Sequence, residues 1–153
     1  MDVRVTGLVA LEKKLTALPT KVARKVIRQA LRKGAKPVKA SVKTNAVAMV
    51  GGEMGSLIAK ATAIRAVGQR PGRASVGVVL TAKYNDDFVH IAKDGKRSYI
   101  PSAIEFGHTG PGGGEKVTPA NPFARRAWHT QKPKALSIIQ NALRAGVERE
   151  AQM

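Results

Sequence analysis

The segment from Thr20 to Thr44 constrains the fold most, because its apolar and basic residues repeat with the period of an α-helix. At 100° per residue, one side of this helix is apolar: Ala23, Val26, Ile27, Ala30, Leu31 and Val38. Seven basic residues fall within an arc of about 80° on the other side, and we call them the basic stripe: Lys21, Lys25, Arg28, Arg32, Lys36, Lys39 and Lys43. Gly34 and Pro37 predict a kink near residues 33–37, because a proline ring displaces the carbonyl four residues earlier.

The basic stripe has no compensating negative charge near it in the sequence. No acidic residue lies between Lys13 and Glu53, and the whole chain holds 27 basic and 10 acidic residues, a formal charge of +17. Residues 1–50 alone contribute 12 basic and two acidic residues. Because like charges at helical spacing repel by some tenths of a kcal/mol per pair, we expect an anionic partner, either DNA or an acidic protein surface.

If DNA is that partner, the residue types of the stripe predict contacts to phosphate. The stripe contains no aromatic side chain for base stacking, and no Asn or Gln that would read bases. Binding would therefore be independent of sequence and sensitive to salt. Seven phosphate contacts would give a log–log salt slope of roughly −6.

The rest of the chain predicts an α+β fold in a single domain over residues 1–153. Before the long helix we expect a short strand at residues 3–5 and a helix of about 12 residues, capped by Thr6 and ended by Pro19. After it, Gly51 to Ser56 is predicted to be a flexible connection. A small, mainly antiparallel sheet follows, with strands at residues 59–67, 74–80, 88–92 and 98–106.

Turn and loop residues complete this prediction. Asp94-Gly95 marks a hairpin, and Pro101 suits a sheet edge or a bulge. Residues 107–121 are predicted to be a flexible glycine-rich loop. A C-terminal helix should run from Pro122 to about Glu150, with a break near Pro133 and with Phe123 and Trp128 anchoring it to the core.

No pattern in the sequence predicts catalysis, a metal or a cofactor. The chain has no cysteine, and its histidines, His90, His108 and His129, are far apart in sequence. Asp86-Asp87 is the only adjacent acidic pair, and Gly112 to Gly114 lacks the Gly-Lys-Ser/Thr ending of a phosphate-binding loop. A small hydrolase is disfavoured because no nucleophile stands with a base. We expect a protein that is not an enzyme.

The sequence also predicts a soluble protein that has no membrane partner and is not exported. No apolar run approaches the roughly 20 residues that cross a bilayer. Residues 1–5 lack the charged-then-apolar layout of a signal peptide.

Two short motifs resemble those of a known family. Glu105-Phe106-Gly107 is followed, after the glycine-rich loop, by Pro119-Ala120-Asn121-Pro122-Phe123 with Arg125 two residues on. This order resembles the pattern E-F-G, then P-A-x-P-F-x-R-x-A, of small neck and tail-completion proteins of long-tailed bacteriophages. Other stretches are similar to that family in the same order, and the chain departs from it after Tyr99 and in the long loop from His108 to Thr118. The similar stretches are Val5–Leu8, Ala30–Val38 and Gly55–Leu57.

The resemblance implies a structural virion protein that catalyses nothing. Such proteins form rings, commonly six-fold, at the head–tail junction beside head-closure, tail-terminator or tail-tube proteins, and are assembled in the cytoplasm of the host bacterium. We also predict that the loop at 107–121 contacts an adjacent subunit or an adjacent ring. The resemblance also implies that the motif residues make subunit contacts: Glu105, Phe106, Gly107, Pro119, Ala120, Pro122, Phe123 and Arg125. The alternative is an architectural nucleic-acid-binding protein that ignores sequence, recruited by the +17 charge.

Overall fold

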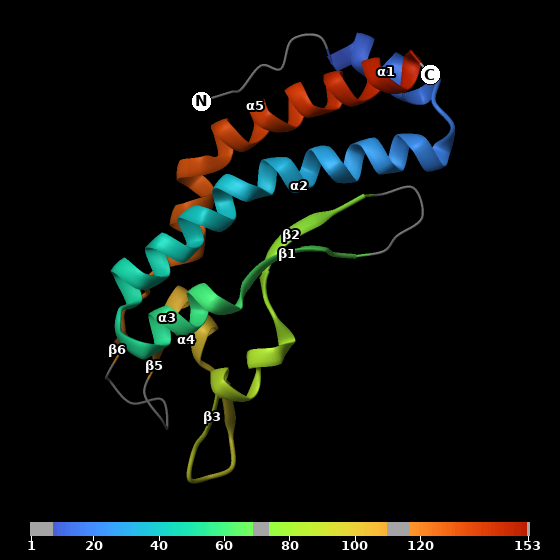
Figure 1. The fold of residues 1–153 in the computed structure, drawn as a ribbon. Helices are drawn as coiled ribbons and strands as arrows, with labels where there is room; N and C mark the ends of the chain where they lie inside the picture. Colours follow the sequence, from blue (N-terminus) through green and yellow to red (C-terminus); the bar gives the residue numbers. More distant parts are fainter. Residues whose placement is uncertain (1–7, 69–73, 110–116, 153) are drawn as a thin grey trace. The chain divides into compact units, whose positions relative to one another are not determined.

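The computed structural model describes residues 8–68, 74–109 and 117–152 (Figure 1). The chain divides into two compact units. Unit 1 comprises Met1–Val38, Ile64–Val78 and Gln131–Met153, and unit 2 comprises Lys39–Ala63 and Val79–Thr130. The predicted strand at residues 3–5, the Thr6 cap and the triple glycine from Gly112 to Gly114 lie outside the described residues. The single domain over residues 1–153 stays a prediction.

Three helices build most of unit 1. They are α1 (Leu8–Thr16) and parts of the two longest helices, α2 (Thr20–Asn45) and α5 (Phe123–Ala151). Within this unit α2 and α5 lie side by side (Figure 1), and they run antiparallel, because Gly34 of α2 approaches Ile139 while Val26 approaches Gly146. The core of the unit is made of small and branched side chains: Val26, Ala30, Val38, Ala135 and Val147.

A close approach of the two helix backbones explains why glycine stands at position 34. A Cβ atom placed there would collide with the Cγ1 of Ile139 and lie 2.9 Å from the carbonyl oxygen of Ala135. Gly34 therefore lets α5 pack directly against the backbone of α2, which outweighs the roughly 1 kcal/mol that glycine costs inside a helix.

The hairpin of β1 (Thr62–Ala66) and β2 (Val76–Leu80) contributes residues to both units. The two strands pair with each other. The N–H of Val67 donates to the oxygen of Ser75 at 3.2 Å, and the N–H of Thr81 donates to the oxygen of Ala61 at 2.9 Å. Because the partner numbers rise in one strand as they fall in the other, the strands are antiparallel.

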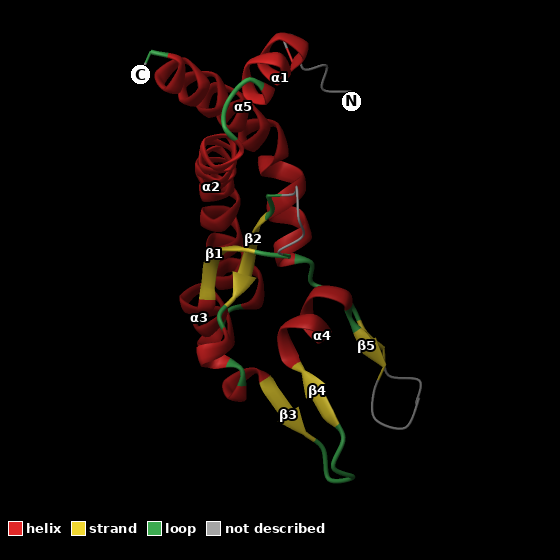
Figure 2. Ribbon diagram, turned by 90° about the vertical axis from the view of Figure 1, so that its right-hand side faces the viewer, coloured by secondary structure: helices red, strands yellow, loops and turns green. Residues whose placement is uncertain are grey.

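Unit 2 is assembled from short elements. After α2 come a π-helical turn (Ala46–Val50) and α3 (Gly52–Ala61), and later two 3₁₀ turns at residues 82–84 and 86–88. β3 (Val89–Ile91) pairs with β4 (Arg97–Tyr99), β4 leads directly into α4 (Ile100–Phe106), and β5 (His108–Thr109) pairs with β6 (Val117–Thr118) (Figure 2). The core contains Val42, Ala46, Ile58, Ala61, Phe88, Phe123 and Ala127.

The α+β class, the long basic helix, the Asp94-Gly95 hairpin and the C-terminal helix are confirmed. α2 continues through Gly34 and Pro37 without interruption, and the kink at residues 33–37 stays a prediction. The predicted break near Pro133 is wrong, because α5 continues through it. α1 ends at Thr16, before Pro19.

Two other predictions are wrong because a helix stands where a connection or strand was expected. Residues 51–56 are not a flexible connection: Gly51 takes a positive φ of 71°, and α3 begins directly after it and extends to Ala61. The strand predicted from Ser98 ends at Tyr99, where α4 begins. Pro101 lies in the first turn of α4, where its missing N–H costs no hydrogen bond, so it marks neither an edge nor a bulge.

The segment from 107 to 121 is not all loop. His108 pairs with Thr118, and Thr109 pairs with Val117. This short ladder holds the two ends of the segment together.

Candidate functional site

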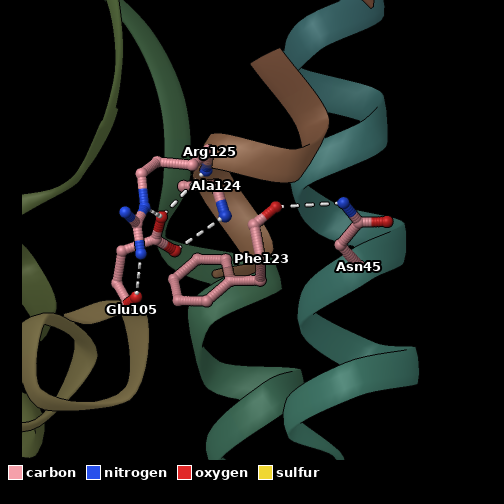
Figure 3. Close-up of polar contacts among 5 residues, drawn as sticks. All are labelled: Asn45, Glu105, Phe123, Ala124 and Arg125. Atoms are coloured by element: carbon pink, nitrogen blue, oxygen red, sulfur yellow. Dashed lines mark hydrogen bonds and ion pairs between the residues drawn. The ribbon is translucent and has the colours of Figure 1, made fainter. Parts of the chain in front are cut away.

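The two family-like motifs meet in unit 2, where the end of α4 reaches the start of α5 (Figure 3). Glu105, whose side chain is buried with 6% of the residue exposed, accepts the N–H of Ala124 at 2.9 Å through Oε2. Its Oε1 accepts the N–H of Arg125 at 2.9 Å and the Nε of the same residue at 3.2 Å. Arg125 Nη2 also donates to the carbonyl oxygen of Glu105 at 3.0 Å. We call this set of contacts the Glu105 cap.

The Glu105 cap has a direct electrostatic reason. The first N–H groups of a helix have no partner within the helix, and the helix dipole makes that end positive. A carboxylate satisfies both needs, and here it comes from a residue 19 positions before Ala124.

Two asparagines extend this network to the end of α2 and to the π-helical turn. Asn121 Nδ2 donates to the carbonyl oxygen of Met49 at 2.7 Å, and the N–H of Asn121 donates to that of Ile104 at 2.7 Å. Asn45 Nδ2 donates to the carbonyl oxygen of Phe123 at 3.0 Å (Figure 3). The two bonds from Asn121 satisfy carbonyl groups near the ends of the π-helical turn and of α4, where helical partners are missing. The bond from Asn45 ties α2 to the first residue of α5.

Gly107 is required by its backbone and by its surroundings. Its φ is 75°, and a Cβ atom would lie 2.7 Å from the oxygen of Thr118 and 2.9 Å from the nitrogen of Ala120. A side chain at this position would strain the backbone and push the segment of residues 117–121 away from α4. The last residue of E-F-G therefore allows the close return of the chain.

The motif residues divide into buried and exposed ones. Glu105 and Phe123 are buried, which confirms the predicted core anchor at Phe123, while Pro119 and Ala120 are exposed and Gly107 and Pro122 half-buried. Phe106 is 63% exposed, and the Arg125 guanidinium lies 5.0 Å from the centre of its ring. The predicted core anchor at Trp128 is wrong, because this side chain is 46% exposed one turn beyond Arg125. We call Phe106, Arg125 and Trp128 the aromatic cluster.

The basic stripe of α2 is exposed along its first part. Lys21, Lys25, Arg28, Arg32 and Lys36 are exposed, and Lys39 and Lys43 are half-buried. The change has a geometric cause: buried residues recur at every fourth position, from Val26 in α2 to Ala46 at the start of the π-helical turn, and each step of four turns the buried face by about 40°. The buried side of the helix therefore turns towards the basic stripe along α2. A helix whose buried side kept one direction would leave Lys39 and Lys43 as exposed as the earlier stripe residues.

Charge is distributed unequally between the units. The residues of unit 1 include 17 basic and four acidic ones, a net charge of +13, whereas unit 2 has 10 basic and six acidic residues, a net charge of +4. The ion pairs of the described residues are Lys96 with Asp94 and Arg125 with Glu105, both in unit 2. None involves the basic stripe.

The described residues contain no group of three or more His, Cys, Asp or Glu side chains that could hold a metal ion. His90 and His108, which are far apart in sequence, line one groove of about 520 Å³ beside the β3–β4 hairpin and α4, together with Asp94. The backbone N–H and the ammonium of Lys96 hold the pKa of Asp94 below its ordinary value of 3.8, and burial raises the pKa of Tyr99.

In the described part of the chain, no helix has the length and apolar character needed to span a membrane.

Comparison with known proteins assigns the family. Residues 10–95, more than half of the 153-residue chain, match the profile of the family described as "Bacteriophage HK97-gp10, putative tail-component". No curated protein and no solved structure matches the chain significantly. The matched stretch covers most of α1, all of α2 and the elements up to the β3–β4 turn. The chain therefore belongs to the HK97-gp10-like family of bacteriophage tail components.

Proposed function

We propose that the protein is a structural part of the phage particle at the head–tail junction, where copies form a ring that helps join head and tail. The observation that carries this proposal is the match to a phage tail-component family over residues 10–95. In this role the ring is six-fold and contacts a head-closure, tail-terminator or tail-tube protein. It is assembled in the host cytoplasm and remains in the virion, and it catalyses no reaction.

The aromatic cluster supports a role in assembly. Trp, Tyr and Arg dominate the energetically important positions of protein interfaces, and exposed apolar side chains that lie together mark interaction surfaces. Phe106 is 63% exposed and Trp128 is 46% exposed, and Arg125 lies over the ring of Phe106. We therefore assign to this cluster the contact between a subunit and its neighbour.

The Glu105 cap prepares that contact. Because Glu105 holds Arg125 through Nε and Glu105's own carbonyl holds Nη2, the guanidinium is fixed over Phe106 before any partner arrives. A side chain that is already ordered loses less entropy on binding. The buried half of the motif thus orients the exposed half.

The experiment that tests the junction role is deletion of the gene from the phage, followed by electron microscopy of the particles. The expected result is separate heads and tails, or tails with incomplete ends, with joined particles restored by the gene supplied in trans. Purified wild-type virions should contain the protein by mass spectrometry. Normal joined particles without the gene, or virions that lack the protein, would refute the proposal.

The interface is tested with the double variant Phe106→Ala/Trp128→Ala. It should support ring formation and particle joining poorly, while its circular dichroism spectrum stays that of the wild type. Val9→Ala is the matched control, since Val9 is also a largely exposed apolar residue but lies in unit 1. If the double variant assembles as well as the control, the cluster is not the contact.

A second candidate is the architectural nucleic-acid-binding protein, which the net charge of +13 on unit 1 favours. Mass photometry separates the two. Rings that bind tail proteins support the junction role, and a dimer that coats DNA and is absent from virions supports the second candidate.

A further inference from the structure

We infer that the exposed part of the basic stripe binds the phosphate backbone of double-stranded DNA without reading its sequence. We call this part the exposed basic row: Lys21, Lys25, Arg28, Arg32 and Lys36, all of unit 1. The inference deepens the proposed function by naming DNA as a partner, and its place in the particle rests on that function. The binding itself needs only the purified protein.

The geometry of the exposed basic row suits a duplex. Its members follow each other at steps of four, three, four and four residues, which place them within an arc of about 80° and along roughly 22 Å of helix. The same length of B-DNA carries about 13 phosphate charges, one for roughly every 1.7 Å of its axis. A single helix face can therefore reach several phosphates at once.

The row is also free of internal compensation. The described acidic residues of unit 1 are Glu12, Glu148 and Glu150, and none of them forms an ion pair with the row. The cations repel one another along the helix, and a polyanion would relieve that repulsion. Binding would release the counterions that condense on DNA, which is the main driving force of sequence-independent binding.

The residue types around the row favour DNA over an acidic protein. Between Lys21 and Lys36, every exposed residue of α2 is basic except Gln29. Protein interfaces have an apolar or aromatic centre and are depleted in lysine, whereas nucleic-acid interfaces are polar and strongly positive. The large apolar residues exposed in the described part of unit 1 are Val9 and Val67, neither of them aromatic, so single strands have no ring to stack on.

The test is fluorescence anisotropy with two labelled 30-base-pair duplexes of unrelated sequence, measured across a series of salt concentrations. Wild-type protein should bind both duplexes equally. Five phosphate contacts predict a log–log slope near −4.5, or a loss of about 500-fold in affinity between 50 and 200 mM salt.

Two variants with the same net charge identify the surface. The row variant carries Lys21→Gln, Lys25→Gln, Arg28→Gln, Arg32→Gln and Lys36→Gln. The matched control replaces five exposed basic residues of unit 2 and lowers the charge equally, from +17 to +12: Lys60→Gln, Lys83→Gln, Lys93→Gln, Arg97→Gln and Arg126→Gln. The row variant should lose most of the salt slope, and the control should keep it.

Three results would overturn the inference: a wild-type slope near zero, an equal loss in both variants, or binding to poly-glutamate in preference to DNA. The last would assign the row to an acidic protein surface. If the row variant does not fold, the smaller change Lys25→Gln/Arg28→Gln/Arg32→Gln decides, with an expected decrease of about 2.7 in the slope. None of these binding measurements depends on particle joining, so the failure of this inference and the failure of the junction role are distinguishable.

Discussion

The two units differ in how their elements are held together. In unit 1 the long helices pack through glycine and small apolar side chains, and no side-chain hydrogen bond among its described residues joins two elements. In unit 2 the side chains of Asn45, Glu105 and Asn121 each bond to another element. Close packing of glycine and small apolar side chains therefore holds unit 1 together, and the exposed basic row takes no part in that packing. Directional polar contacts join the elements of unit 2 and hold Arg125 over Phe106.

The largest expected effect tests the packing of unit 1. Gly34→Leu should destabilise the protein by about 3 kcal/mol, because the new side chain overlaps Ile139 and lies against the carbonyl oxygen of Ala135. Urea denaturation followed by circular dichroism measures the loss. Gln29→Leu places the same side chain at an exposed position of α2 and should change stability by less than about 0.5 kcal/mol. Equal effects of the two variants would show that α2 and α5 do not pack closely.

The next effect tests the polar contacts of unit 2. Glu105→Ala should cost about 2 kcal/mol, because two backbone N–H groups at the start of α5 and the Arg125 guanidinium lose their buried acceptor. The same denaturation experiment measures it. Glu53→Ala is the control, since Glu53 is an exposed glutamate in the first turn of α3, and it should cost only a few tenths of a kcal/mol. A loss no larger than that of the control would mean that the cap does not hold α5.

Sequence periodicity predicted the elements whose signal is local. α2 has six or more turns of consistent pattern, and the β3–β4 hairpin has a turn dipeptide between its strands. α3 and α4 were missed because their stability comes from elsewhere in the chain. Gly55, which favours a loop by composition, packs against the carbonyl of Ala46, and α4 is a seven-residue helix that no periodic pattern could distinguish from a strand.

The sequence identified residues of the site but not the contacts that they make. Resemblance selected Glu105, Phe123 and Arg125, but only the structure gives Glu105 its buried partners at the start of α5. Trp128 was assigned to the core because it is, with Phe123, one of two aromatic residues near the start of the last helix, and its exposure depends on tertiary packing that sequence spacing does not encode. In the same way, the rotation of the buried face along α2 follows from a four-residue packing repeat with no separate signal in the charges.

A smaller effect tests the charge of unit 1. Raising the salt concentration from 0.05 to 0.5 M should stabilise the wild-type protein by some tenths of a kcal/mol, because salt screens the repulsion along the exposed basic row. The measurement is the denaturation midpoint at the two concentrations. The row variant should lose this stabilisation, and the matched five-residue variant of unit 2 should keep it. The same response in both variants would mean that net charge, and not the arrangement on α2, sets the salt dependence.

The smallest expected effect concerns a solvent-exposed polar contact of unit 2, between Asp94 and Lys96. Asp94 accepts the N–H of Lys96 at 3.1 Å and pairs with its ammonium at 3.2 Å. The backbone bond and then the ammonium lower the folded pKa of Asp94 below 3.8, so the contact stabilises the hairpin above the unfolded pKa and is lost as pH falls through the folded pKa. Because the pair is exposed, solvent screening keeps its contribution to stability small.

NMR titration of the Asp94 carboxyl should give a pKa under 3.8. The variant Lys96→Gln should raise this pKa only in part, since the larger cause, the backbone N–H, remains. A full return to the ordinary value in Lys96→Gln would assign the shift to the ammonium alone. In that case the directional contacts that distinguish unit 2 would be limited to its buried network.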